Sequence, residues 1–345
     1  MDVLLALLAL FNVLSMVAVF IPRTFPDNMA PWIVFAFALL ATELAWLWLP
    51  VQAVLALVFV TGGALQSGLG AFSLAVLAVS WLGLAWSIRV GLQTGPVVEA
   101  ALTQELGPDY RATIPPAVSR GFRHVVRFAD WRRPFAMPVP GVQVIRNIAY
   151  IEGGGVRQRL DIYRPDNVPP ECCPVLLQIH GGAWMIGAKE EQALPLMYRM
   201  ASHGWICVAA NYRLSPSVGF PKHLEDCKAA LAWIRSKGRE YGMDPSFVAV
   251  TGGSAGGHLS ALMGLTENRP ELQPGFTDVD TSVQACVPFY GVYDFLNRSG
   301  ARPRSEKFVE FLGERVVHAK PEDNPALWDL ASPITQIHAD VPPFI

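Results

Sequence analysis

One stretch, residues 248–259, constrains the fold of this chain more than any other, because it predicts a strand, a sharp turn and a helix in direct succession. An apolar β-branched run leads into a Gly-x-Ser-x-Gly pentapeptide, with Gly252 and Gly256 on either side of Ser254. Small neighbours are needed there, since a serine on so tight a turn adopts a strained backbone conformation. Such a turn exposes the serine hydroxyl as a nucleophile and puts the Ala255 N–H at a helix start. An ordinary glycine-rich turn is the alternative interpretation.

A second motif supports the nucleophile interpretation. Residues 174–179 are predicted to form a buried strand that leads into the sequence His-Gly-Gly-Ala-Trp at positions 180–184. A glycine-rich loop after a strand can present backbone N–H groups to the oxyanion that forms when a serine attacks a carbonyl carbon. The predicted donors are the backbone N–H groups of Gly181, Gly182, Ala183 and Ala255. His180 is predicted to be a structural partner of its own loop.

Both motifs resemble those of the hormone-sensitive-lipase-like branch of the α/β hydrolases. Further segments match that family in the same order, and these are residues 160–165, 211–216, 220–221, 224–226 and 290–295. The resemblance implies an α/β-hydrolase sheet and a serine carboxylic ester hydrolase that forms an acyl-enzyme on Ser254. It implies neither a metal nor an organic cofactor. Membrane-anchored actinobacterial esterases are the nearest likeness, and prenylcysteine methylesterases are a more distant one.

The acid and the base of this chemistry are not identified by the sequence. In the resembled family the order along the chain is serine, acid, histidine, and the acid follows a core strand that begins with a Pro-Pro-Phe-like sequence. Residues 341–345 match that beginning. We therefore expect the acid and the base to lie beyond Ile345, and the 345-residue chain to be a nearly inactive, incomplete version of a longer hydrolase.

The histidines after Ser254 offer an alternative. A rearranged triad would pair His338 with Asp329 or Asp340, and His318 and Asp294 are the further candidates. His258 lies four residues along the helix from Ser254, so its side chain is expected to point along that helix and away from the serine hydroxyl.

The first 95 residues predict transmembrane helices. The chain is 52% hydrophobic and only 16% charged. That apolar excess is concentrated in residues 1–95, where five side chains are charged, those of Asp2, Arg23, Asp27, Glu43 and Arg89. Three apolar runs, residues 4–21, 31–49 and 71–86, approach the roughly 20 residues that a span requires. Residues 51–65 are a marginal fourth run after a break at Pro50.

With three spans, the N-terminus lies outside and the region after the last span lies in the cytoplasm. This arrangement puts Arg23 and Arg89 on the same, cytoplasmic side of the membrane. A cleaved signal is the alternative for the first run, but Asp2 stands where a signal would carry basic residues. Glu43 is a functional candidate as an isolated carboxylate in a span, and we expect it to face a neighbouring helix.

The organisation predicted from these patterns has three parts. Residues 1–95 form the transmembrane helices, residues 96–140 a basic junction or cap segment, and residues 141–345 an α/β-hydrolase domain that is incomplete at its C-terminus. In the last part, residues 142–151 and 160–163 predict an antiparallel pair. The remaining predictions are buried strands at 175–179, 206–210, 247–250 and 283–289, and helices at 191–201 and 221–237.

The function predicted is that of a membrane-anchored esterase or lipase that acts on a lipophilic acyl ester at the bilayer. A catalytically inactive membrane protein that keeps the fold for binding is the alternative, and an amidase or formamidase would use the same parts. A net charge of −2, with no Walker or dinucleotide-binding glycine pattern, argues against nucleic acid or nucleotide partners. Five cysteines without paired metal-binding spacing predict no metal site.

Overall fold

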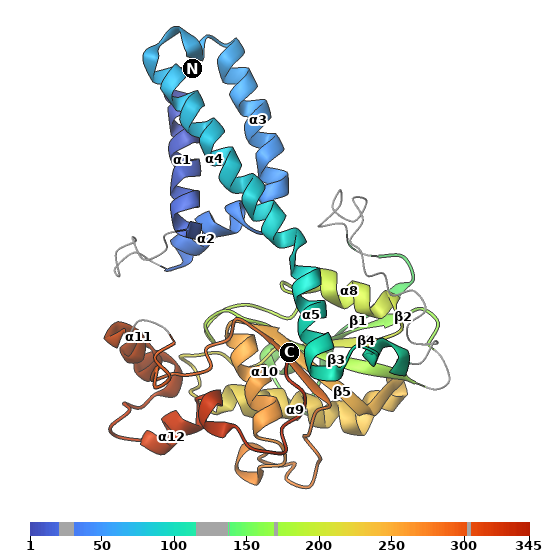
Figure 1. The fold of residues 1–345 in the computed structure, drawn as a ribbon. Coiled ribbons are helices and arrows are strands. Elements are labelled where there is room, and N and C mark those ends of the chain that lie inside the picture. The colour runs from blue at the N-terminus through green and yellow to red at the C-terminus, as the bar shows by residue number, and fades with distance from the viewer. Residues whose placement is uncertain (21–30, 115–136, 138, 169–171, 302–304) are drawn as a thin grey trace. The chain divides into compact units, whose positions relative to one another are not determined.

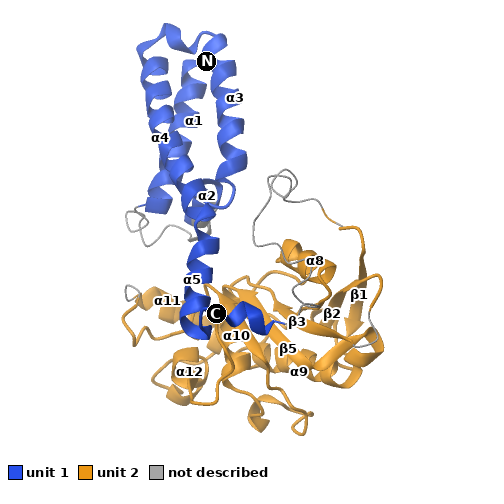
Figure 2. Cartoon of the chain, turned by 45° about the vertical axis from the view of Figure 1, so that its right-hand side comes forward, with its two compact units in different colours: residues 1–124 blue, residues 125–345 orange. Residues whose placement is uncertain are grey.

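The computed structural model describes residues 1–20, 31–114, 137, 139–168, 172–301 and 305–345. The chain divides into two compact units, residues 1–124 and residues 125–345 (Figure 2). The boundary falls within the predicted junction of residues 96–140, and most of the arginine-rich part of that junction lies outside the described residues. The three-part division therefore stays a prediction.

Unit 1 is helical (Figure 1). Its helices are α1 (Asp2–Phe20), α2 (Pro31–Ala41), α3 (Ala45–Thr61), α4 (Gly68–Leu92) and α5 (Thr94–Leu106), with short 3-10 turns at Ala64–Gln66 and Tyr110–Thr113. Two segments, Asp2–Phe20 and Gly68–Leu106, are long and apolar enough to cross a membrane, where the sequence predicts about three. Length and composition alone carry this result, which a signal sequence or a buried core helix would also give.

The second predicted span, residues 31–49, is not a single helix. α2 ends at Ala41, residues 42–44 form a turn, and α3 runs from Ala45 through Pro50. The predicted break at Pro50 is wrong, because a proline in the second turn of a helix removes one backbone hydrogen bond and leaves the later turns intact.

The helix breaks at Thr42 instead. The Thr42 N–H still makes its helical bond to the Ala38 carbonyl oxygen, but the Leu44 N–H donates to the Leu39 carbonyl oxygen, five residues back, so the regular helical bonding ends there. Glu43 lies in the turn that follows, with an exposed side chain. The expectation that Glu43 faces a neighbouring helix is therefore also wrong.

The interior of unit 1 contains a polar network. Asn12 of α1 and Gln52 of α3 are fully buried, and Gln52 Nε2 donates to Asn12 Oδ1 at 2.9 Å. Two residues of α4 complete the network. Asn12 Nδ2 donates to Ser80 Oγ, and Trp81 Nε1 donates to Gln52 Oε1 at 2.8 Å. These side chains join three helices, and their hydrogen bonds offset the cost of burying polar groups.

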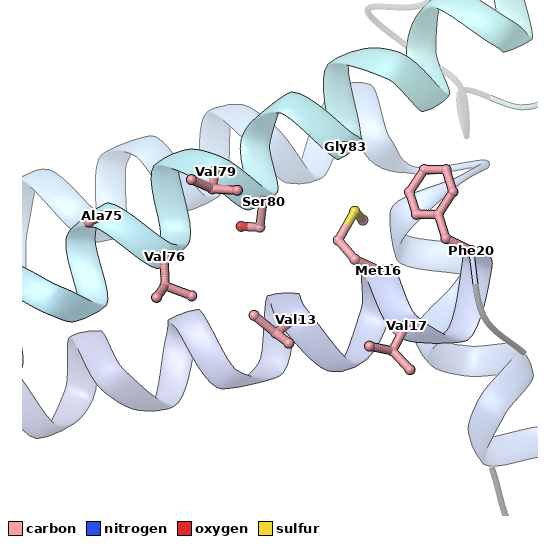
Figure 3. Close-up of a pocket in the computed structure, with 9 residues that line it drawn as sticks. All are labelled: Val13, Met16, Val17, Phe20, Ala75, Val76, Val79, Ser80 and Gly83. Atoms are coloured by element: carbon pink, nitrogen blue, oxygen red, sulfur yellow. The ribbon is translucent and has the colours of Figure 1, made fainter. Parts of the chain in front are cut away.

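An apolar groove of about 490 Å³ lies beside this network, between α1 and α4 (Figure 3). Val13, Met16 and Phe20 line one side, and Val76 and Val79 line the other. Among the described residues that line the groove, Ser80 alone has a polar side chain and none is titratable. The lining of the groove is therefore suited to contact with hydrocarbon chains and provides no acid or base group.

Unit 2 is built on a six-stranded mixed sheet in the order β1-β2-β4-β3-β5-β6. The strands are β1 (Val142–Ala149), β2 (Arg159–Pro165), β3 (Cys173–Ile179), β4 (Ile206–Ala210), β5 (Met243–Gly253) and β6 (Ala285–Phe289). β2 pairs antiparallel with both β1 and β4, and the other neighbours are parallel. Each predicted strand is confirmed, and the mixed sheet agrees with the expected α/β-hydrolase fold.

Helices cover both faces of this sheet. α8 (Leu194–Ser202) packs on one face, where alternate strand residues such as Leu176 and Cys207 are buried. α9 (Lys222–Lys237) and α10 (Ala255–Leu265) pack on the other, against residues such as Leu177 and Val208. This alternation of side chains is what a two-sided sheet requires. The short helices α11 (Glu306–Phe311) and α12 (Pro325–Leu330) follow β6.

The last residues of the chain lie beside β6. Phe344 forms a parallel bridge with Cys286, whose N–H donates to the Pro343 carbonyl oxygen at 2.9 Å. This is one isolated bridge and not a strand, so the expectation that residues 341–345 begin the next strand of the sheet stays a prediction.

Candidate active site

Ser254 stands on the sharp turn that the sequence predicts. β5 ends at Gly253 and α10 begins at Ala255, so the serine is the single residue between strand and helix. Its φ of 56° and ψ of −117° lie in a region that costs a non-glycine residue about 1–3 kcal/mol. Its N–H donates to the Phe289 carbonyl oxygen at 3.0 Å. Among the described residues, nothing hydrogen-bonds to the half-buried Ser254 hydroxyl, which leaves this oxygen free to react.

The glycines around Ser254 are needed because the turn packs on the end of β3. A Cβ on Gly256 would lie 2.1 Å from the Ile179 carbonyl oxygen, and one on Gly252 would lie 2.5 Å from the same atom. No real Cβ approaches an oxygen so closely. The two glycines therefore let the turn lie directly against the loop that follows β3.

That loop carries the predicted oxyanion donors. β3 and β5 are parallel neighbours with Ile179 opposite Gly252, so the segments that follow them meet at the same edge of the sheet. A Cβ on Gly181 would lie 3.4 Å from the Ser254 Cβ. The loop then turns sharply, with φ values of 120°, 51° and 61° at Gly182, Ala183 and Trp184.

Three of the four predicted donors are free. Within the described part of the chain, no acceptor binds the N–H groups of Gly182, Ala183 or Ala255. The N–H of Gly181 instead donates to Gln192 Oε1 at 2.7 Å. The prediction that Gly181 supplies an oxyanion donor is corrected here, because its proton is already held by a side chain.

Neither the His180 ring nor the His258 ring bonds to the Ser254 hydroxyl, although the His258 backbone N–H donates to the Ser254 carbonyl oxygen at 3.0 Å. His180 stacks on Tyr212 with ring centroids 4.4 Å apart, and its Nδ1 lies 2.8 Å from the Gly181 carbonyl oxygen, so it holds its own loop as predicted. His258 is fully buried between Trp184, whose indole N–H donates to Nδ1 at 3.1 Å, and the Ala331 carbonyl oxygen, 2.8 Å from Nε2. Both ring nitrogens of His258 are therefore occupied.

The remaining candidates of the rearranged triad lie apart. His338 Nε2 is 3.5 Å from Glu267, which follows the C-terminal end of α10, whereas Ser254 precedes its N-terminal end. Eleven helical residues span roughly 16 Å, so His338 and Ser254 are at opposite ends of that helix. Asp329 is paired with Arg298, and Asp340 is exposed.

The other two candidates also bind elsewhere. Asp294 Oδ2 accepts the Ser299 N–H at 2.8 Å. His318 packs against Gly219, where a Cβ would lie 2.8 Å from its Nδ1. The structure thus assembles no serine, histidine and acid triad among the residues that it describes.

Sequence reasoning did not assign a role to a buried ion pair that holds the oxyanion loop. Lys189, just after the loop, lies 2.9 Å from Asp161 Oδ1 in β2, and both side chains are at most 3% exposed. The Asn147 N–H donates to Asp161 Oδ1 at 2.7 Å, and Lys189 Nζ donates to Asn147 Oδ1 at 3.1 Å. The available signal was a carboxylate within an apolar strand, since such a group is rarely buried unless it is paired.

Buried histidines predict an acid-sensitive fold. Burial lowers the pKa of His180 and His258 to about 4 and that of His223 to about 3, below the usual 6.5. The unfolded chain therefore binds more protons than the folded one below pH 6.5, so stability falls as the pH falls toward 4. Between pH 6 and 5 we expect a loss of about 1 kcal/mol for each histidine, measured by urea unfolding.

Two variants check the origin of that pH dependence. His258→Gln should reduce the slope of unfolding free energy against pH by about one proton. Ser260→Ala, at a buried side chain that does not titrate, should leave the slope unchanged. An unfolding free energy that is constant from pH 7 to 5 would contradict the prediction.

Comparisons with known proteins agree with this geometry. The protein-family model BD-FAE matches residues 160–345. Esterase LipQ of Mycobacterium tuberculosis is 40% identical over 270 residues, which cover 77% of this chain and 62% of LipQ. The probable carboxylic ester hydrolase LipM of the same organism is 45% identical over 290 residues, which cover 78% of this chain and 64% of LipM. The chain thus spans less than two thirds of the length of these relatives.

Solved structures give the same fold. A truncated carbohydrate esterase from gut microbiota is 26% identical with a TM-score of 0.52, covering 59% of this chain and 75% of that one. Inhibited esterase B from Lactobacillus rhamnosis is 26% identical with a TM-score of 0.51, and the match covers 62% of this chain and 69% of esterase B. Both of these proteins are named esterases. Among the described residues, no group of histidine, cysteine, aspartate and glutamate side chains could hold a metal ion.

Proposed function

Since the chain belongs to the BD-FAE family of α/β hydrolases, we propose that it is a membrane-anchored serine esterase that acts on lipophilic acyl esters through Ser254. One observation carries the proposal. The unbonded Ser254 hydroxyl is held in a strained conformation beside a loop whose Gly182 and Ala183 N–H groups have no acceptor among the described residues. The names of LipQ and LipM support ester hydrolysis as the reaction.

In the proposed reaction, Ser254 Oγ attacks the ester carbonyl carbon while a base takes the hydroxyl proton. The carbonyl oxygen becomes an oxyanion, which the N–H groups of Gly182, Ala183 and Ala255 stabilise. The carbon–oxygen bond to the alcohol then breaks, and the base returns the proton to the leaving alkoxide. Water hydrolyses the acyl-enzyme by the same steps and regenerates Ser254.

The base and its acid partner are proposed to come from outside residues 1–345. Among the described residues, His258 has both nitrogens occupied and His338 lies at the far end of α10. A serine hydroxyl is a weak nucleophile without a base in contact. The described residues place no base beside Ser254, so the proposed activity depends on a histidine outside them.

Many exposed side chains of unit 1 are apolar and several buried ones are polar, which supports a membrane anchor. Leu57, Val79 and Leu82 are each more than 60% exposed, whereas Asn12 and Gln52 are fully buried. A water-soluble bundle has the opposite pattern, since exposing large apolar side chains to water is unfavourable. Inward polar side chains that bond between helices, with apolar ones outside, are what a bilayer favours.

We propose that α1, α3 and α4 are the three crossings. α3 has 17 residues, at the lower limit for a span, and the Asn12–Gln52–Ser80 network ties these same three helices together. Two crossings, α3 and α4, then separate the end of α1 from Arg89 in the last turn of α4, so these two points lie on one side of the membrane. The positive-inside tendency makes that side cytoplasmic and places the hydrolase unit there.

A binding protein without catalysis explains the site less well. Strain at Ser254 costs folding free energy, and a binding protein has no need of a strained, exposed hydroxyl. An amidase would use the same nucleophile and oxyanion donors, and the esterase names of the relatives favour esters.

The test assays p-nitrophenyl butyrate hydrolysis by residues 1–345 and by the same chain continued through its downstream reading frame. Membranes are washed with alkaline carbonate, which strips peripheral proteins, and are then dissolved in detergent. We expect turnover from washed membranes that carry the continued chain only. Turnover by residues 1–345 would contradict the placement of the base, activity in the soluble fraction would contradict anchoring, and no turnover by either chain would contradict the esterase.

A further inference from the structure

The side chain of Gln192 bonds to both polar groups of one residue in the oxyanion loop. Its Oε1 accepts the Gly181 N–H at 2.7 Å, and its Nε2 donates to the Gly181 carbonyl oxygen at 3.4 Å. Gln192 lies eleven residues further along the chain, just before α8. One amide group thus holds the backbone on both sides of the Gly181 Cα.

Holding the Gly181 carbonyl oxygen also fixes the next N–H group. The Gly181 C=O and the Gly182 N–H belong to one planar peptide and point in opposite directions. His180 Nδ1 lies 2.8 Å from the same oxygen, so two donors hold it on the side of Gln192. The Gly182 N–H, which has no acceptor among the described residues, must then point to the opposite side.

Close packing keeps this arrangement rigid. A Cβ on Gly181 would lie 3.3 Å from Gln192 Oε1 and 2.6 Å from the Gly253 carbonyl oxygen, so the Gly181 backbone is enclosed between Gln192 and the turn that carries Ser254. A Cβ on Gly187 would lie 2.5 Å from the Gly181 carbonyl oxygen. The Gly181 backbone is therefore closely packed on the side of Gly187 and on the side of the Ser254 turn.

We infer that Gln192 is a positioning residue that aims the Gly182 N–H at the oxyanion of the bound ester. The inference rests on the proposed esterase function and deepens it, because it names the side chain that sets the direction of an oxyanion donor. An N–H aimed at the developing charge stabilises the transition state more than the bound substrate. Loss of Gln192 should therefore lower kcat and leave KM nearly unchanged.

Two substitutions separate the two bonds of Gln192. Gln192→Leu removes both, and Gln192→Glu keeps an acceptor for the Gly181 N–H but loses the donor to the carbonyl oxygen. The matched control is Glu191→Gln, at the exposed neighbouring position. Each variant is measured for hydrogen exchange in a peptide that begins at least two residues before Gly181 and ends at residue 187, and for kcat and KM with p-nitrophenyl butyrate in the chain length that turns over.

We expect about tenfold lower kcat in both Gln192 variants, with KM within twofold of the parent. Exchange of the Gly181 amide should rise at least tenfold in Gln192→Leu, whereas Gln192→Glu should keep it slow. Glu191→Gln should match the parent in every measurement. Proportional changes in KM and kcat, or a kcat that is unchanged while exchange rises, would overturn the inference.

The two proposals fail in different ways. Unchanged exchange in Gln192→Leu overturns only the role of Gln192, whatever the activity. Absence of Ser254-dependent turnover in the parent chain overturns the esterase, and the aimed oxyanion donor falls with it.

Discussion

Replacing Ser254 by alanine is expected to lower kcat for p-nitrophenyl butyrate by about 10⁶-fold in the chain length that turns over. The hydroxyl is the only atom group removed, and alanine keeps the small side chain that the strained φ of 56° allows. Without Oγ no acyl-enzyme forms, and only substrate binding and the oxyanion donors still act on the reaction. Stability should rise or stay equal, since the change removes no hydrogen bond made by the side chain within the described residues.

The matched control for this loss is Ser260→Ala on the same helix. The Ser260 hydroxyl is buried and donates to the Gly256 carbonyl oxygen at 2.7 Å. Removing one such bond costs about 1 kcal/mol of stability and should change kcat by less than threefold. If Ser254→Ala retains more than one thousandth of the parent kcat while Ser260→Ala is normal, another residue is the nucleophile.

The turn around Ser254 could be predicted because its residue pattern reports backbone geometry directly. Only glycine fits at positions 252 and 256, where a Cβ would meet the Ile179 carbonyl oxygen. The same logic located β3 and β5, whose apolar runs are buried on both faces. The order of the sheet was not predictable in this way, because the place of β4 between β2 and β3 depends on pairing between distant segments.

In unit 1, the expectation that proline ends a helix fails. Pro50 is the strongest sequence signal for a helix break in residues 31–65, yet α3 runs through it and the break falls at residues 42–44. The backbone bonding shifts there, because the Leu44 N–H donates to the Leu39 carbonyl oxygen, five residues back. Hydropathy and residue type do not specify such a local shift.

The correction at Gly181 has a similar cause. From sequence alone, each N–H in a glycine-rich loop is a possible oxyanion donor, since glycine leaves the peptide free to face either way. The structure commits the Gly181 N–H to Gln192 and leaves the Gly182 and Ala183 N–H groups available. Peptide orientation is set by a side chain eleven residues away, so the loop motif by itself does not reveal it.

Replacing Gly256 by alanine is expected to damage both the fold and the site. The new Cβ would lie 2.1 Å from the Ile179 carbonyl oxygen and 2.8 Å from that of His180, both backbone atoms that cannot rotate away. Relief requires the turn and the oxyanion loop to separate, at a cost of about 3 kcal/mol in unfolding free energy. A displacement of about 1 Å between Ser254 and the oxyanion donors costs about 10²-fold in kcat.

Gly155→Ala is the control for that substitution. A Cβ on Gly155 meets nothing within 4 Å, and its φ of −72° suits alanine. Urea unfolding should show no loss of stability for Gly155→Ala, and kcat should stay within twofold of the parent. Gly256→Ala with parental stability and kcat would mean that the turn does not pack against the end of β3, and the close contact between nucleophile and oxyanion loop would have to be abandoned. A stable Gly256→Ala protein with a 10²-fold lower kcat would instead show that the two segments moved apart without unfolding, which still requires their contact in the parent chain.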